Sequence, residues 1–364
     1  MSRISIFYYR SKLNSGGPDR KGIMKYLIFS ILILLGTQSL FAQNNSAAHR
    51  YLIYKDGKYG FIDQQGKEVI PPKFEKCTAF QEGFARFQSK GKWGFIDVDG
   101  RVVVPAKYDD AMDFSEGVAP VRKGRLWGYV NARDSLVIPL VYTQALLFKE
   151  GVAPVQMVRR FAFFWINRGY GYINHQNQIV IPPRYSYAYS FSDSVAAVNY
   201  TKKLLYVFPL YVKREFINHK GEPVITTSYQ GLTTFSEGMA RFQKDHMIGF
   251  IDKTGKVVIE PQFQNAFQFS EGLAAVKLGN KWGFINKKGK IAIPTEYEYV
   301  LSFSDSLAPV KKDGHWFYIN HLGETAIQGS FEHCMPFKDG LANVLINGKS
   351  AYIDKQGQVI WQSK

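Results

Sequence analysis

From residue 51 onward, short blocks of apolar residues alternate with turns that are rich in Gly, Asp and Asn. One such stretch carries apolar blocks at Leu273 to Lys277, Lys281 to Asn286 and Lys290 to Pro294. Asn286, followed three residues later by Gly289, separates the second block from the third. This spacing is typical of a type I turn that ends in a left-handed residue. The pattern predicts a meander of three short antiparallel strands.

The same stretch returns with a fixed spacing. Gly60, Gly94 and Gly128 are 34 residues apart, and so are Gly249 and Gly283. A period in this range indicates a repeat architecture, in which each unit completes its core against its neighbours. The middle strand recurs at nine positions, so residues 51–364 hold about nine units. These positions are Phe61, Phe95, Tyr129, Tyr172, Phe216, Phe250, Phe284, Tyr318 and Tyr352.

The middle strand is apolar on both faces. Because side chains alternate along a strand, Trp282 and Phe284 point to one face while Gly283 and Ile285 point to the other. Such a strand must be covered on both sides, so we expect each small sheet to lie between those of neighbouring units. The predicted fold is all-β: tandem three-stranded antiparallel meanders, arranged either as a propeller or as an open superhelical solenoid. The predicted repeat core includes Trp93, Gly94, Trp127, Gly128, Trp282, Gly283 and Trp316.

The recurring Trp-Gly pairs at Trp93-Gly94, Trp127-Gly128 and Trp282-Gly283 resemble those of the WG repeat family. The resemblance implies a bacterial repeat scaffold that is used for binding, without a shared catalytic residue. Some units depart from the pair, and we expect them to pack less regularly. The departures are Tyr59, Tyr170, Arg214-Glu215, Phe317 and Ala351.

Two adjacent units are longer than the others. Gly128 and Gly171 are 43 residues apart, and Gly171 and Glu215 are 44 apart. The insertions, near 157–168 and 201–213, fall between the first and second strands, so we expect two long hairpins on the same side. Large apolar side chains that project beyond a repeat core mark an interaction surface; the alternative is that the hairpins pack on each other. The candidate binding residues are Arg159, Arg160, Phe161, Phe163, Phe164, Trp165, Tyr206, Phe208 and Tyr211.

Residues 24–42 have the pattern of a secretory signal. A lysine follows Met24, and a short apolar run from Leu27 to Leu35 leads to a small residue before the expected cut. The run is short for a membrane span, which needs about 20 apolar residues. We expect a mature chain that begins at Gln43; the alternative is an uncleaved anchor.

The residues on either side of this signal fit the same interpretation. Residues 1–23 precede the signal and are interpreted as an over-extended start, and 43–50 form a short linker before the repeats at 51–364. The sequence therefore predicts an exported protein, periplasmic or extracellular, with no transmembrane span after signal cleavage.

Charge and cysteine content exclude some functions. Residues 1–42 hold six basic and one acidic side chain, so the rest holds 46 − 6 = 40 basic and 30 − 1 = 29 acidic, a net charge of +11. This excess is spread over turns, whereas nucleic-acid binding needs a clustered basic face.

Cys77 and Cys334 occupy the same repeat position, where other units have Ala, Leu or Val. We expect both to behave as small buried hydrophobes and not as a disulfide.

An acidic residue recurs before the first strand of the units: Glu82, Glu116, Glu150, Asp193, Glu237, Glu271, Asp305 and Asp339. These carboxylates are interpreted as turn residues. The alternative is a polysaccharide hydrolase, which needs two carboxyl groups about 5 to 9.5 Å apart.

His175, His219 and His321 share a turn position and are interpreted as solvated. The sequence predicts a non-enzymatic scaffold for a protein or an envelope glycan, with no metal, cofactor or nucleic acid.

Overall fold

The computed structural model describes residues 49–161, 164–204, 208–227, 229 and 231–364, without the side chains of 159–167, 201–213, 227 and 330. Every regular element in this described part of the chain is a β-strand. The strands form nine antiparallel sheets, each built from consecutive strands. We number these sheets as blades 1 to 9 along the chain.

The bounds of the strands follow in chain order. Blades 1 to 3 are β1 Tyr51–Lys55, β2 Lys58–Ile62, β3 Glu68–Phe74; β4 Lys76–Cys77, β5 Phe84–Ser89, β6 Lys92–Asp97, β7 Val102–Tyr108; β8 Asp110–Ala111, β9 Val118–Lys123, β10 Leu126–Asn131, β11 Leu136–Tyr142. Blades 4 to 6 are β12 Gln144–Ala145, β13 Val152–Phe161, β14 Phe164–Asn174, β15 Ile179–Tyr185; β16 Tyr187–Ala188, β17 Ala196–Leu204, β18 Phe208–Ile217, β19 Pro223–Thr227; β20 Met239–Lys244, β21 Met247–Asp252, β22 Val257–Phe263. Blades 7 to 9 are β23 Asn265–Ala266, β24 Leu273–Leu278, β25 Lys281–Asn286, β26 Ile291–Tyr297; β27 Tyr299–Val300, β28 Ala308–Lys312, β29 His315–Ile319, β30 Thr325–Phe331; β31 His333–Cys334, β32 Ala342–Ile346, β33 Lys349–Ile353, β34 Val359–Gln362.

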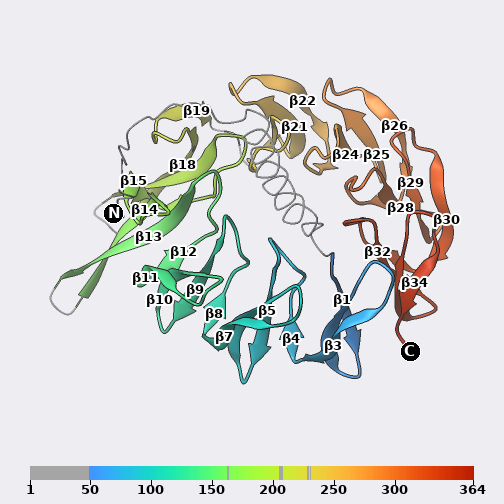
Figure 1. Cartoon of the computed structure of the whole chain (residues 1–364). Coiled ribbons are helices and arrows are strands. Elements are labelled where there is room, and N and C mark those ends of the chain that lie inside the picture. Colours follow the sequence, from blue (N-terminus) through green and yellow to red (C-terminus); the bar gives the residue numbers. More distant parts are fainter. Residues whose placement is uncertain (1–48, 162–163, 205–207, 228, 230) are drawn as a thin grey trace, which may run out of the picture. The chain divides into compact units, whose positions relative to one another are not determined.

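Seven blades carry a fourth strand that the three-strand pattern did not predict. It is only two residues long; in blade 7, for example, Asn265 pairs with Lys277 and Ala266 with Val276. A two-residue strand is too short to show the alternation of apolar and polar residues by which a strand is predicted from sequence. Figure 1 shows the first strands of a blade toward the inside of the ring and the last strand outside, as with β24 and β26.

Blade 1 packs against blade 9, so residues 49–364 form a closed nine-bladed propeller, and the open solenoid is excluded. Tyr51 and Ile53 share a buried cluster with Leu341 of blade 9. The rings of Tyr51 and Tyr352 lie 5.6 Å apart. The hydroxyl of Tyr51 donates to the carbonyl of Asp339 at 2.5 Å.

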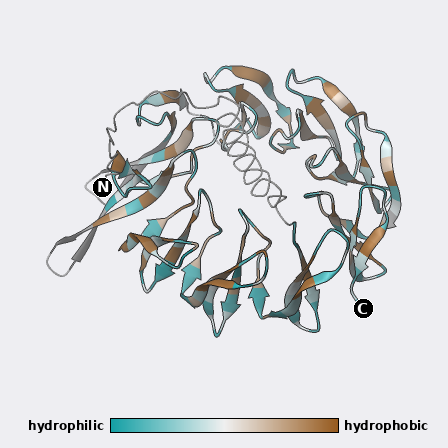
Figure 2. Cartoon of the chain, viewed as in Figure 1, coloured by the Kyte–Doolittle hydropathy of each residue, from teal (hydrophilic) through white to brown (hydrophobic). Residues whose placement is uncertain are grey.

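The core lies between successive blades. Trp282 and Phe284 of blade 7 are buried in one cluster with Val300 and Val310 of blade 8. Figure 2 shows apolar stretches along the strands and polar turns between them. Of the Trp residues assigned to the core, Trp127, Trp282 and Trp316 are buried, whereas Trp93 is partly exposed.

A serine hydroxyl links many of these neighbours at the same repeat position. Ser115, for instance, donates to the carbonyl of Phe148 in the next blade at 2.6 Å. The same bond joins Ser192 to Phe235, Ser236 to Phe269, Ser270 to Phe303, and Ser304 to Phe337.

The Gly of the Trp-Gly pair is required by a close approach of the third strand. A Cβ on Gly283 would lie 2.6 Å from the carbonyl oxygen of Ile293 and 2.7 Å from the backbone of Pro294. The third strand bulges at this point, because Trp282 pairs with Tyr297 but Phe284 with Ile293. Gly and Pro are thus partners across a bulge.

Blade 5 lacks both partners. Glu215 replaces the Gly and pairs in register with Thr226, without a bulge at this point. The departure expected to give irregular packing therefore gives a more regular ladder. The described residues contain no helix long and apolar enough to cross a membrane.

Candidate functional site

The recurring acidic residues connect neighbouring blades. Glu116 has a left-handed backbone, with φ of 54°. Its carboxylate accepts the backbone N–H of Gly151, the equivalent turn of the next blade, at 3.1 and 3.2 Å. Equivalent bonds run from Glu82 to Gly117, Glu150 to Ser194, Asp193 to Gly238, Glu237 to Gly272, Glu271 to Ser306, and Asp305 to Gly340.

This arrangement favours the turn interpretation over the hydrolase alternative. A carboxylate that already accepts backbone N–H groups is committed to the fold. The sequence predicted a turn acid but not its partner, which lies a full repeat away. The spacing between each acid and its partner, 35 residues in the regular units and 44 or 45 across the two long units, follows the repeat and was the signal that could have indicated the link.

The three turn histidines are part of the same links and not simply solvated. The Nε2 atom of His175 lies 3.0 Å from Oε2 of Glu116, and the imidazole stacks on Phe148 with ring centroids 4.0 Å apart. His219 and His321 repeat this arrangement with Glu150 and Glu271. In the described part of the chain, no three His, Cys, Asp or Glu side chains are grouped to hold a metal ion.

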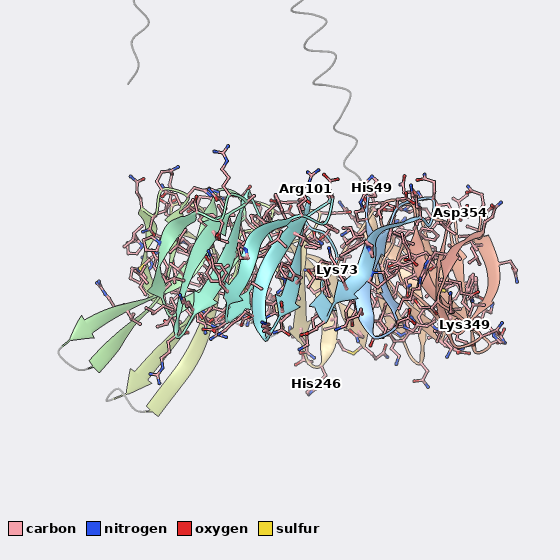
Figure 3. The ribbon with its side chains drawn as sticks, turned by 60° about the horizontal axis from the view of Figure 1, so that its bottom comes forward. His49, Lys73, Arg101, His246, Lys349 and Asp354 are labelled. Carbon is pink, nitrogen blue, oxygen red and sulfur yellow. The ribbon has the colours of Figure 1, made fainter. Side chains whose placement is uncertain are left out.

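The two insertions form long hairpins in adjacent blades. Strands β13 and β14 stay paired out to Phe161 and Phe164, and β17 and β18 out to Leu204 and Phe208. Figure 3 shows both hairpins on the side of the ring that carries His246. The side chains of all nine candidate binding residues lie outside the described part, as does the backbone of Phe163 and Tyr206.

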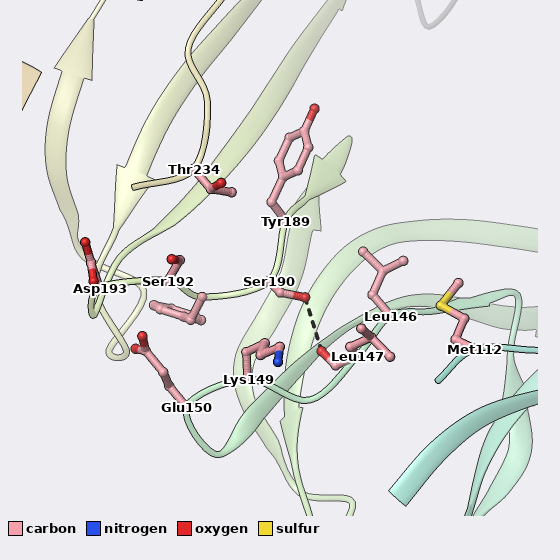
Figure 4. A pocket seen from close by; sticks show the side chains of 11 residues that line it. Met112, Leu146, Leu147, Lys149, Glu150, Tyr189, Ser190, Ser192, Asp193 and Thr234 are labelled. Atoms are coloured by element: carbon pink, nitrogen blue, oxygen red, sulfur yellow. Dashed lines mark hydrogen bonds between the residues drawn. The ribbon is translucent and has the colours of Figure 1, made fainter. Parts of the chain in front are cut away.

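Two hollows lie beside the blades that carry these hairpins. The first, of about 700 Å³, is formed by blades 3 to 6 and includes Met112, Leu146 and Tyr189. Figure 4 shows its side chains, with the hydrogen bond from Ser190 to the carbonyl of Leu147. The second, of about 560 Å³, we call the Arg241 hollow. It is lined by Tyr189, Leu232, Thr233, Thr234, Arg241, Phe267, Gln268 and Ser302.

The repeat pattern is also broken beside these hollows, in β18 of blade 5, where Arg214 and Glu215 replace the Trp-Gly pair. Arg214 donates to Asn199 Oδ1 at 3.0 Å and to the carbonyl of Leu232 at 2.9 Å. Its guanidinium lies 5.9 Å from the ring centroid of Tyr189. Glu215 is buried, with 5% of its surface exposed. Arg214 therefore supports Tyr189, which lines both hollows.

Comparison with known proteins gives a family and a fold. The family model described as "WG containing repeat" matches residues 59–93, 93–127, 127–157, 170–203, 216–245, 248–282, 282–316 and 316–349. A search of curated proteins finds no match.

Among solved structures, one described as a eukaryotic initiation factor superposes with a TM-score of 0.60 at 9% identity, over 87% of this chain and 95% of that chain. The dihydro-heme d1 dehydrogenase NirN gives a TM-score of 0.46 at 12% identity, over 87% of this chain and 73% of that one. At 9% identity the likeness to the first of these structures concerns the fold alone.

Proposed function

The chain belongs to the WG repeat family, and from this premise we propose that it is a non-catalytic propeller scaffold for a protein or a cell-envelope glycan. The proposed role involves no cofactor or metal, and the carboxylates of Glu116 and Glu237 act in it as links between blades. The scaffold binds through its surface, as repeat proteins do.

One observation carries the assignment of the contact surface. The period lengthens at two adjacent units, and both extra segments extend one side of the ring as hairpins, β13–β14 and β17–β18. The regular blades close the propeller without such extensions. Aromatic and basic residues are interleaved in both segments, and aromatic anchors commonly dominate interface energies.

Export is part of the proposal. The segment 24–42 has the pattern of a secretory signal, and a bacterial protein with this segment is delivered to the periplasm or beyond. The intact mass of the native protein is expected to correspond to a chain that begins at Gln43. A mass that retains Leu27 to Leu35 would indicate an anchor instead.

The contact surface is tested by shortening both hairpins. Removal of Val158 to Asn167 and Lys202 to Tyr211, with ordinary repeat turns in their place, is expected to leave circular dichroism and melting largely unchanged. Capture of an envelope protein or glycan by the immobilised full chain is expected to be lost in the shortened variant. Phe161→Ser with Trp165→Ser, which keeps the hairpin length, separates loss of side chains from loss of length.

Two outcomes would contradict the assignment. Unfolding of the shortened variant would show that the hairpins are structural. Undiminished capture by a folded shortened variant would move the contact to another surface of the ring.

A further inference from the structure

Two blades carry an arginine at the same position of their first long strand. Arg86 is the third residue of β5, and Arg241 is the third residue of β20. In both cases Nη1 donates to the carbonyl of an alanine on the short strand of the next blade. Arg86 reaches Ala111 and Arg241 reaches Ala266. The two guanidinium groups are therefore anchored in the same way.

Only one of the two has a carboxylate partner. Nε of Arg86 donates to Oδ1 of Asp113 at 2.7 Å. The residue equivalent to Asp113 beside Arg241 is the neutral Gln268. Its side-chain amide donates instead to the carbonyl of Thr234 at 2.7 Å and to the Thr234 hydroxyl oxygen at 3.1 Å.

Arg241 is consequently a cation without a counter-charge. Within the described part of the chain its Nε is closed to solvent and has no hydrogen-bond partner, and no carboxylate forms an ion pair with it. Burial lowers the pKa of this guanidinium, because no neighbouring negative charge offsets the loss of hydration. A buried donor without a partner in a native protein calls for an explanation.

The surroundings of Arg241 favour a particular class of ligand. Three residues that carry hydroxyl groups, Thr233, Thr234 and Ser302, and the aromatic Tyr189 also line this hollow. None of the described residues that line it is acidic. Its volume of about 560 Å³ lies in the range of small-molecule sites. Hydroxyl groups beside an aromatic ring match a sugar, and an unpaired guanidinium matches a carboxylate, which it binds with two parallel hydrogen bonds.

We propose that the Arg241 hollow binds an acidic saccharide, whose uronate carboxylate takes the place that Asp113 occupies beside Arg86. The carboxylate meets the outer amino group of Arg241 and reaches Nε by displacing the amide of Gln268 from Thr234. The hydroxyl groups of Thr233 and Ser302 then bind the sugar hydroxyl groups. This site is separate from the hairpins and gives the scaffold a second ligand.

The test uses trigalacturonate as the probe and calorimetric titration of the full chain. We expect saturable binding, with affinity for the fully methyl-esterified trisaccharide lower by about tenfold or more, because the charge-assisted hydrogen bonds are lost. Gln268→Asp supplies the internal carboxylate that Arg86 already has. It is expected to lower the affinity to a similar extent without lowering the melting temperature.

Two controls isolate the site. Asp113→Gln changes the matched position in blade 3, next to Arg86 of blade 2, and is expected to leave the affinity of the Arg241 hollow undiminished. The hairpin-shortened chain is expected to bind trigalacturonate like the full chain, so failure of this proposal and failure of the proposed function are distinguishable.

Several results would overturn the proposal: no saturable binding of trigalacturonate, equal affinity for the ester, or unchanged affinity in a folded Gln268→Asp variant. Competition by inorganic sulfate at equal concentration would show a general anion site and would equally overturn the saccharide assignment.

Discussion

The hydroxyl of Tyr352 in blade 9 donates a hydrogen bond to the carbonyl oxygen of Leu52 in blade 1, at 2.8 Å. The two residues are 300 positions apart in the sequence. Elsewhere the tyrosine of the middle strand binds the next blade along the chain; Tyr129, for example, donates to Leu146 at 2.7 Å. Blade 9 thus makes with blade 1 the same bond that an internal blade makes with the next blade along the chain, and this bond helps to close the ring.

Removing the closing hydroxyl should cost as much as removing an internal one. We expect Tyr352→Phe and Tyr129→Phe each to lower the free energy of unfolding by about 1 kcal/mol, because each leaves a carbonyl without its donor. Urea denaturation of both variants measures this. A cost at Tyr129 with none at Tyr352 would mean that the ring is not held closed in solution.

The tryptophans should differ in their contribution to stability. Trp282→Ala is expected to lower the free energy of unfolding by about 3 to 5 kcal/mol, because it empties a large buried site between two blades. Trp93→Ala should cost less, since Trp93 is partly exposed. Equal melting of the Trp282 variant and the parent protein would refute the core assignment.

Gly283→Ala should be strongly destabilising despite its small size. The added Cβ would lie 2.6 Å from the carbonyl oxygen of Ile293, so the bulged third strand must move. We expect a cost of about 1 to 3 kcal/mol, as for overpacking of a core. Ala351→Gly is the matched control, because blade 9 already has a side chain there and pairs Ala351 with Gln362. A harmless Gly283→Ala would show that the close approach is not maintained.

The interblade carboxylates should contribute to stability and not to turnover. Glu271 accepts the N–H of Ser306 at 3.1 Å and pairs with His321. Glu271→Gln is expected to cost about 1 kcal/mol, a modest value because the side chain is about one-third exposed. Glu260→Gln, at an exposed position of β22, should cost nothing measurable. Loss of a polysaccharide-cleaving activity in the Glu271 variant would revive the hydrolase alternative.

The buried cysteine gives a prediction for alkaline pH. Burial raises the pKa of the Cys334 thiol to about 12, so the folded protein keeps its proton where the unfolded chain has lost it. The stability that this group contributes is complete below about pH 9 and declines as the pH rises toward 12. Iodoacetamide should therefore label Cys334 slowly at pH 9 in the native state and rapidly in urea. Rapid native labelling would show that the thiol is accessible.

Cys334→Ala places the residue that blades 3, 4, 5 and 7 have at this position. The variant should fold and should lose less stability between pH 9 and 12 than the parent protein. An unchanged alkaline decline would assign it to other groups, such as the buried phenol of Tyr318, whose pKa is also raised by burial.

The sequence was sufficient to predict the strands but not the contacts between blades. The period and the two apolar faces of the strand at Trp282 predicted stacked antiparallel sheets, because both signals are local. Closure depends on the angle between blades, which no single unit encodes, so the contact of Tyr51 with Tyr352 was not predictable. The same holds for Glu116, whose turn was evident from the following Gly while its partner Gly151 lies in another blade.

The candidate sites differ in the same way. The hairpins were visible as breaks in the period, because insertions change spacing. Arg241 was not visible, since arginine at one position of one strand has no pattern; it became notable only when the structure placed Asp113 beside Arg86 and Gln268 beside Arg241.

The bonds between blades have a consequence for how such a chain changes over time. Blades 3 and 5 to 8 each offer the next blade a serine hydroxyl and an acid, as Ser270 and Glu271 do for blade 8. A duplicated stretch of 34 residues would therefore meet complementary neighbours at both ends, and a deleted one would leave neighbours that match. The bonds between these blades therefore do not by themselves fix the number of blades, and the angle between neighbouring blades must set the count of nine.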